Sequence, residues 1–318
     1  VGYLIGEENR GLQYMFTMMN SARLAVGHQG VAVGERAYQQ AVAYARDRVQ
    51  GRVDGIEGGA AIIHHPDVKR MLIQMRAQTE AGRAMSFYAI AAEDRSFYHP
   101  DQKVRTESAR LVEILTPLVK AWCTEVAMET TSLGIQVHGG MGFIEETGAA
   151  QHMRDARILP IYEGTNGIQA LDFIGRKCLR DGGEGLSALL TEMTLTASVT
   201  SASPQLQGLH SSLEMAITQC REALDSVLAN PQQSAYTAYG YMMLFGNSVS
   251  FWLMVKLAVA AQKQLDQGSE ERFYPQKIST AQFFASQLLT RNHAYLAAVT
   301  DCADYLSSFE DKDFTTLE

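Results

Sequence analysis

Helical periodicity is the feature that most limits what this chain can fold into. From Leu12 onward, apolar residues recur mostly three, four or seven positions apart, which places them on one face of an α-helix. They are Leu12, Met15, Phe16, Met19, Ala22, Val26, Val33, Ala37, Ala41 and Tyr44. Gly27, Gly30 and Gly34 lie inside this stretch, and each costs helix stability relative to alanine. We therefore expect one long helix, against which another backbone packs closely at these glycines.

The same periodicity continues through most of the chain, and no convincing strand interrupts it. A second helix is predicted from Pro66, because proline suits a first turn, and a third over about 106–137. Pro117 should kink or restart the third helix, with Thr116 as its N-cap. Further helices are predicted at about 149–157, 165–179, 205–229, 233–267 and 276–309. Long helices with short connections predict an all-α, antiparallel long-helix bundle followed by a second helical domain.

A glycine-rich stretch, RDGGEG from Arg180 to Gly185, interrupts the pattern as a linker would. With 318 residues, the chain has room for about two domains of roughly 150 residues each. We predict a helical bundle over residues 1–180 and an additional C-terminal helical domain over 186–318. The sequence begins at Val1 in the middle of what looks like a domain. We therefore interpret the chain as the C-terminal part of a longer protein.

Composition excludes several classes of protein. The 27 basic and 35 acidic residues give a net charge of −8, which disfavours binding to nucleic acid. The histidines lack the spacing of a zinc site, so no metal site is predicted. The cysteines lie far apart without a C-x-x-C motif, which is typical of reduced thiols in a cytoplasmic protein. They are Cys123, Cys178, Cys220 and Cys302.

The most apolar stretch, residues 241–261, is long enough to span a bilayer at roughly 20 residues. Its polar residues, Asn247, Ser248, Ser250 and Lys256, would be costly in lipid. We therefore predict a buried helix and no transmembrane segment.

The stretch IYEGTNGIQA, residues 161–170, places one acidic side chain, Glu163, after apolar Ile158, Leu159 and Ile161. A solvated surface loop is one interpretation. A general base is the other, because apolar surroundings disfavour the charged form of a carboxylate and make it more basic.

Two further stretches leave alternatives open. GGMG at 139–142 follows a predicted helix, whereas a dinucleotide fingerprint requires a preceding strand. It is either a helix stop or a place where backbone N–H groups approach a phosphate or a ring. YARDRVQGR at 44–52 is either a solvated helix end or a clamp for a pyrophosphate, since guanidinium groups bind phosphates bidentately.

Four motifs, taken in order, resemble the C-terminal helical domain of acyl-CoA dehydrogenases over about residues 1–180. They are MMNSARLAVGHQGVA, YARDRVQGR, QVHGGMGFIEETGAAQHMRDARI and YEGTNGIQALD. The remainder, about 185–318, resembles the extra helical domain of larger bacterial members, including the 3-methylmercaptopropionyl-CoA dehydrogenase type.

The resemblance implies an FAD-dependent enzyme in which the flavin lies between a β-domain and this bundle and reaches across a subunit interface. Glu163 would remove the α-proton of an acyl-CoA thioester while the β-hydrogen leaves as hydride, giving a trans-2-enoyl-CoA. An electron-transferring flavoprotein would accept the electrons, and the protein would be a homodimer or homotetramer. An acyl-CoA oxidase and a non-catalytic helical scaffold are the competing interpretations.

The resemblance also assigns site residues. The positions matched to FAD contacts are Arg48, Gln136, Gly139, Gly140 and Thr165, and those matched to the substrate site are Arg23, Tyr162 and Gly164. From the sequence alone, Arg23 equally fits a buried structural ion pair. Ala22 stands where some members carry the base, so no acid there competes with Glu163. The chain departs from the family pattern at 49–50, where a phenylalanine is missing, and at Pro66 and Gly167, which replace glutamines.

Overall fold

The computed structural model describes residues 1–201, 203–301 and 303–314. Helices make up nearly all of its regular structure, and these residues contain no strand, only one isolated antiparallel bridge between Val49 and Ala61. The all-α prediction is confirmed. The chain forms two compact units, Val1–Thr165 and Asn166–Glu318, and each is described by itself.

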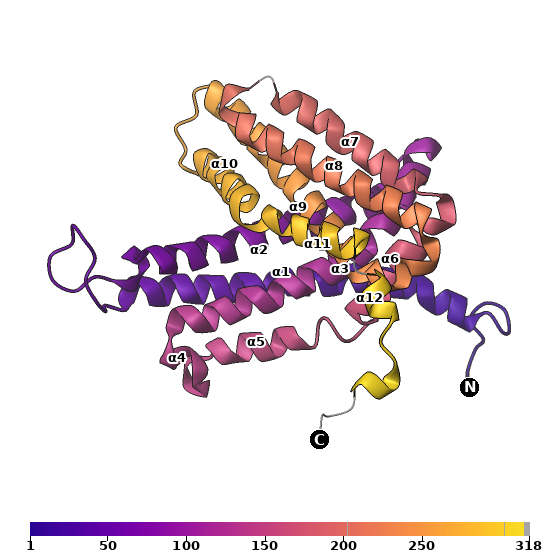
Figure 1. Ribbon diagram of the computed structural model, residues 1–318, viewed down its shortest axis with the longest axis horizontal. Coiled ribbons are helices and arrows are strands. Elements are labelled where there is room, and N and C mark those ends of the chain that lie inside the picture. Colours follow the sequence, from indigo (N-terminus) through magenta and orange to yellow (C-terminus); the bar gives the residue numbers. More distant parts are fainter. Residues whose placement is uncertain (202, 302, 315–318) are drawn as a thin grey trace. The chain divides into compact units, whose positions relative to one another are not determined.

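Three long helices build the first unit. α1 (Gly11–Asp47), α2 (Pro66–Tyr98) and α3 (Gln102–His138) lie side by side, as Figure 1 shows. The short helix α5 (Ala149–Arg157) packs along α1 and α3. These helices confirm the predicted ones, except that α3 begins earlier because the Asp101 side chain caps it by accepting from Lys103 N at 2.8 Å.

Backbone packing explains two glycines of α1. A Cβ atom at Gly27 would lie 2.5 Å from the Val119 carbonyl oxygen, and one at Gly30 would lie 2.8 Å from that of Cys123. Residue numbers increase in the same direction on both helices, from Gly27 to Gly30 and from Val119 to Cys123, so α1 and α3 run parallel at this contact. Gly34 differs, because its nearest neighbour is the Thr130 side chain at an ordinary 3.5 Å. Close backbone packing is therefore confirmed at two of the three glycines.

The predicted restart of the third helix at Pro117 is wrong. α3 continues through Pro117, and the Thr116 hydroxyl donates to the Val112 carbonyl oxygen at 2.7 Å instead of capping a new helix. The turns around the proline are buried, with Leu115 and Leu118 fully covered. Their burial stabilises the helical conformation despite the lost backbone hydrogen bond.

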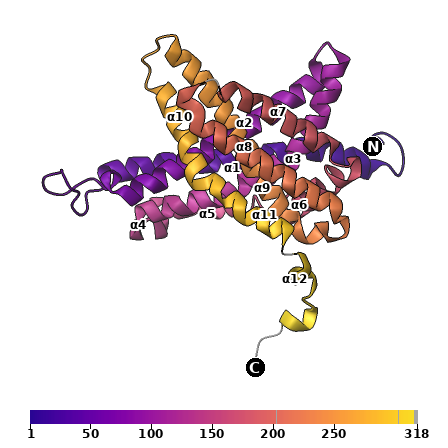
Figure 2. The same ribbon diagram turned by 45° about the horizontal axis from the view of Figure 1, so that its top comes forward.

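The second unit is built around α9 (Ser234–Asp266). The helices that accompany it are α6 (Asn166–Arg176), α7 (Glu184–Thr200), α8 (Gln207–Ala229), α10 (Phe273–Phe283), α11 (Asn292–Thr300) and α12 (Ala303–Ser307). Phe173 of α6 packs on Tyr241 of α9 with ring centroids 5.5 Å apart. Figure 2 shows the loop that joins α9 to α10.

The apolar segment of α9 is by length and composition able to cross a membrane, but 83% of it is buried inside the protein. Its polar side chains have partners there. Asn247 Nδ2 donates to Asn292 Oδ1 at 3.1 Å, and Asn292 Nδ2 donates to Ser248 Oγ at 2.9 Å. This arrangement favours the interpretation of a core helix.

The structure differs from the sequence-based expectation at two places in the second unit. α7 was not predicted, although its buried residues have helical spacing: Leu186, Leu189, Leu190, Met193 and Ala197. The predicted helix over 276–309 is broken after Phe283 by a π-helical segment, Phe284–Leu288, and a 3-10 turn, Leu289–Arg291.

The stretch RDGGEG lies inside the second unit. The Asp181 carboxylate accepts from the backbone N–H groups of Gly183 and Gly185, at 3.0 Å each, where α7 begins. Gly183 is buried, and a Cβ atom there would lie 3.0 Å from the Leu224 side chain. Along the chain, the first compact unit ends at Thr165, so α6 belongs to the second unit. The domain boundary at 180–186 stays a prediction.

Candidate active site

Glu163 has an unusual backbone conformation. Its φ of 57° lies in the left-handed region, and Gly164 follows with φ 87°. A side chain in this region crowds the backbone at a cost of roughly 1–2 kcal/mol. Such strain persists only where surrounding contacts impose it, and it clusters at functional sites.

Two hydrogen bonds join this loop to α1. The Nε atom of Arg23, a buried side chain, donates to the backbone carbonyl oxygen of Glu163 at 3.3 Å. The Tyr162 hydroxyl donates to Gln29 Oε1 at 2.5 Å. Glu163 itself has a buried carboxylate oxygen, Oε2, without a hydrogen-bond partner among the described residues. A buried acceptor without a partner is uncommon and calls for an explanation.

Lys120 belongs to the same neighbourhood and was missed by the sequence analysis. Its side chain is fully buried on α3. Burial lowers its pKa to about 8, Arg23 lowers it too, and the carboxylates of Glu125 and Glu163 act in the opposite direction. Lysine is rarely buried, so residue type alone argues against such a position. The available signal was its place in the apolar run LTPLVKAW, residues 115–122.

A second group of predicted residues lies where α1 and α3 end. Arg48 follows α1, and Gln136 and Gly139 end α3, with the Tyr44 and His138 rings 4.4 Å apart between the two helices. Arg48, Gln136, Gly139 and Gly140 are all exposed. Gly139 has φ 60°, and a Cβ atom at either glycine would meet nothing within 4 Å. This open surface offers a guanidinium group, an amide and accessible backbone.

The two groups are far apart within one chain. Arg23 and Arg48 lie on or next to the same helix, about 37 Å apart at about 1.5 Å of rise per residue. The structure therefore forms two separate groups that do not reach one another. One group contains Arg23, Tyr162, Glu163 and Gly164. The other contains Arg48, Gln136, Gly139 and Gly140. Thr165, also exposed, follows Gly164 directly.

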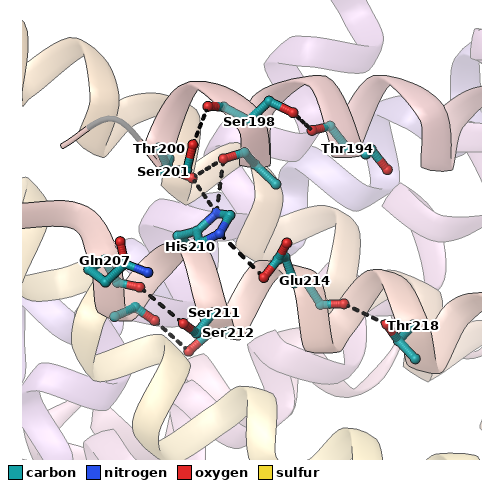
Figure 3. Close-up of polar contacts among 12 residues, drawn as sticks. Thr194, Ser198, Thr200, Ser201, Gln207, His210, Ser211, Ser212, Glu214 and Thr218 are labelled. Carbon is teal, nitrogen blue, oxygen red and sulfur yellow. Dashed lines mark hydrogen bonds and ion pairs between the residues drawn. The ribbon is translucent and has the colours of Figure 1, made fainter. Parts of the chain in front are cut away.

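A polar cluster on α7 and α8 has the composition of a second candidate site (Figure 3). His210 Nδ1 lies 3.0 Å from the Ala197 carbonyl oxygen and 3.3 Å from Thr200 Oγ1, and Nε2 lies 3.3 Å from the Glu214 carboxylate. A hydroxyl, an imidazole and a carboxylate in this order are typical of nucleophilic catalysis. However, Thr200 is fully buried, and its hydroxyl donates to Ala197 at 2.6 Å. The cluster therefore caps the C-terminus of α7.

No group of three or more metal-binding side chains occurs in the parts of the chain that the structure describes. Three of the four cysteines, Cys123, Cys178 and Cys220, are fully or almost fully buried free thiols. Cys302 lies outside the described residues.

Comparison with known proteins supplies the family. The sequence model described as acyl-CoA dehydrogenase, C-terminal domain, matches residues 9–179. The chain belongs to the acyl-CoA dehydrogenase family. A second model, described as acetyl-CoA dehydrogenase C-terminal like, matches residues 189–310.

One relative of this acyl-CoA dehydrogenase chain is the 3-methylmercaptopropionyl-CoA dehydrogenase of Ruegeria pomeroyi. It is 47% identical over 96% of the chain, which covers 53% of the relative. The chain thus spans about half the length of the curated relatives it matches.

Solved structures share the fold. Caenorhabditis elegans ACDH-11 in complex with C11-CoA has a TM-score of 0.74 at 21% identity, over 93% of this chain and 49% of its own. An acyl-CoA dehydrogenase of Bacillus anthracis complexed with FAD has a TM-score of 0.72 at 22% identity, over 95% and 53%.

Proposed function

We propose that the protein carrying this chain is an FAD-dependent acyl-CoA dehydrogenase that converts an acyl-CoA into a trans-2-enoyl-CoA. One observation carries the proposal: Glu163 is held in a left-handed conformation with a carboxylate oxygen that is buried and without a partner. The sequence of this family domain also places Glu163 in the motif YEG. A poised carboxylate of this kind suits removal of a weakly acidic proton next to a thioester carbonyl.

The residues around Glu163 prepare that proton transfer. Arg23 and the Tyr162–Gln29 hydrogen bond fix the loop, so the carboxylate does not need to be ordered when the substrate binds. Glu163 takes the α-proton and becomes neutral. Its own backbone N–H would donate to the thioester oxygen, on which negative charge develops.

The second group of residues fits the pyrophosphate and adenosine part of FAD. Arg48 provides a cation for bidentate binding of phosphate, and the Gly139–Gly140 turn lets a ligand approach the backbone without meeting a side chain. Gln136 adds a polar contact in this group, whereas Thr165, next to Gly164, would add one beside the Glu163 site. When bound, FAD would accept the β-hydrogen of the substrate as hydride.

Because the two groups lie about 37 Å apart, one flavin cannot contact both groups of a single chain. We therefore propose a homodimer or homotetramer, in which the Arg48 group of one copy serves the Glu163 site of another. An electron-transferring flavoprotein is proposed as electron acceptor. A cytoplasmic location stays a prediction.

A visible spectrum of the full-length protein tests the proposal. A yellow protein whose flavin absorbance bleaches anaerobically with one of a panel of acyl-CoAs is the expected result. Rapid reoxidation by air with release of peroxide would instead identify an acyl-CoA oxidase. A colourless protein that binds no acyl-CoA would overturn the proposal and favour a helical scaffold. The 318-residue chain alone should purify largely without FAD, because half a site must bear the whole cost of ordering the ligand.

A further inference from the structure

The glycine turn at residues 139–142 is held between two helices. On one side it lies against α3, because a Cβ atom at Gly142 would collide with the Ile135 carbonyl oxygen. The Gly142 N–H group also donates to the Gly139 carbonyl oxygen at 2.9 Å, which closes the turn. On the other side, the segment that follows the turn is tied to α1 by Gln40. The proposed reaction gives Gln40 no role.

Gln40 joins α1 both to this segment and to α5. Its Nε2 atom donates to the Thr147 carbonyl oxygen at 2.6 Å, and its Oε1 atom lies 2.8 Å from His152 Nε2. A carbonyl oxygen can only accept, so the amide must present its NH2 group to Thr147. Oε1 then faces His152, whose Nε2 atom must carry a proton and donate. Both ends of the amide have a partner, and its orientation is therefore fixed.

Thr147 passes this constraint to the turn itself. Its hydroxyl donates toward the carbonyl oxygens of Met141 and, at 2.9 Å, Ile144. Met141 follows Gly140 directly, so a bond that holds Thr147 also restrains the backbone of the turn. Gln40 and Thr147 are both partly buried, and a hydrogen bond shielded from water is stronger than an exposed one.

A second link between this segment and α5 is exposed to solvent. Arg154 forms a bidentate ion pair with Glu145, at 2.8 and 2.7 Å, but both side chains are more than half exposed. Exposed ion pairs contribute only about 0–1 kcal/mol and are screened by salt. The bonds of Gln40 are therefore the ones expected to order the turn, and the ion pair provides a comparison within the same segment.

We propose that Gln40 is a positioning residue for the cofactor, which holds the Gly139–Gly140 turn in the conformation that receives the pyrophosphate and adenosine part of FAD. This inference rests on the proposed function of the Arg48 group. Gln40 does not touch the ligand. Because its amide orders the turn beforehand, FAD binding does not have to bear the entropic cost of fixing that backbone.

The first test measures order and needs no flavin. Gln40→Glu has the same shape and can still accept from His152, but its carboxylate cannot donate to the Thr147 carbonyl oxygen. Hydrogen exchange of the full-length protein should become about tenfold faster in residues 139–147 and stay unchanged in the buried middle of α3. Glu145→Gln, which breaks the exposed ion pair, should change exchange in the turn by no more than about threefold. Unchanged exchange in Gln40→Glu, or equal effects of the two variants, would overturn the inference.

The second test measures the affinity of the full-length protein for FAD after removal of its flavin. Gln40→Met, which removes the amide without adding a charge, should raise the Kd by about tenfold. The rate of flavin reduction at saturating FAD should stay near that of wild type, because Glu163 belongs to the other group of residues. Gln39→Met is the matched control and should change the Kd by less than about twofold, since Gln39 is exposed. An unchanged Kd in Gln40→Met would contradict the inference.

His152 allows a rescue experiment. His152→Leu leaves Gln40 Oε1 without its donor and should raise the Kd for FAD, whereas His152→Gln, whose amide can donate, should restore the affinity. Equal weakening by both variants would count against the proposed hydrogen-bonded chain. A wild-type protein that binds no FAD would instead defeat the proposed function, while faster exchange of the turn in Gln40→Glu would still show that Gln40 orders it.

Discussion

Arg23 donates a hydrogen bond from its Nε atom to the backbone carbonyl oxygen of Glu163, 140 residues later in the chain, at 3.3 Å. The bond goes to the backbone of Glu163 and leaves its carboxylate available. A buried arginine thus fixes the loop, while one carboxylate oxygen remains without a partner among the described residues. This division between a held backbone and an uncommitted side chain is the basis of the first two predictions.

Glu163→Gln should abolish flavin reduction in the full-length protein while FAD and acyl-CoA still bind. Glutamine keeps the shape of the side chain but cannot accept the α-proton, and general-base catalysis is typically worth about 10²–10⁴-fold. Stopped-flow bleaching of the flavin, with ligand binding measured on the same variant, provides the test. Glu146→Gln is the matched control, since Glu146 is exposed. Near wild-type bleaching by Glu163→Gln would show that the base lies elsewhere.

Glu163→Gly should be more stable than Glu163→Ala by about 1 kcal/mol, although both lose the carboxylate. At φ 57° an alanine keeps the Cβ atom that crowds the backbone, whereas glycine does not. Chemical denaturation of the two variants measures the difference. Equal free energies of unfolding would mean that the left-handed conformation carries no strain.

Gly27→Ala should destabilise the first unit by about 1–3 kcal/mol, because the added Cβ would lie 2.5 Å from the Val119 carbonyl oxygen and force the helices apart. Gly175→Ala in α6 is the control. A Cβ atom there meets nothing within 4 Å, so better helix propensity should leave stability unchanged or raised by up to about 1 kcal/mol. Thermal or denaturant unfolding distinguishes them, and similar effects at both glycines would argue against close backbone packing.

Cys123 and Cys220 should resist alkylation in the native protein at pH 8. Burial raises the pKa of the Cys220 thiol to about 12 and that of Cys123 further, so the reactive thiolate is scarce and also covered. Mass spectrometry after a short iodoacetamide pulse, with and without denaturant, locates the modified residues. Labelling of either thiol at the rate of the denatured chain would contradict their burial.

The sequence by itself determined the helices whose signals are local. Pro66 marked the start of α2, and the turn at Gly139 marked the end of α3. The glycines of α1 predicted a close backbone contact, which Gly27 and Gly30 make. The four motifs identified the family, because each is a short stretch that can be recognised without knowing where it lies in space. The helical spacing of the apolar residues in α7 is a local signal as well, although it was not recognised.

The tertiary structure decided everything that depends on residues far apart in the chain. Packing kept α3 continuous through Pro117, against the local preference of proline. It buried Lys120, which residue type alone assigns to the surface. It also joined Arg23 to Glu163. The physical reason is that helical periodicity reports which face of a helix is apolar, whereas only packing selects the partner of that face.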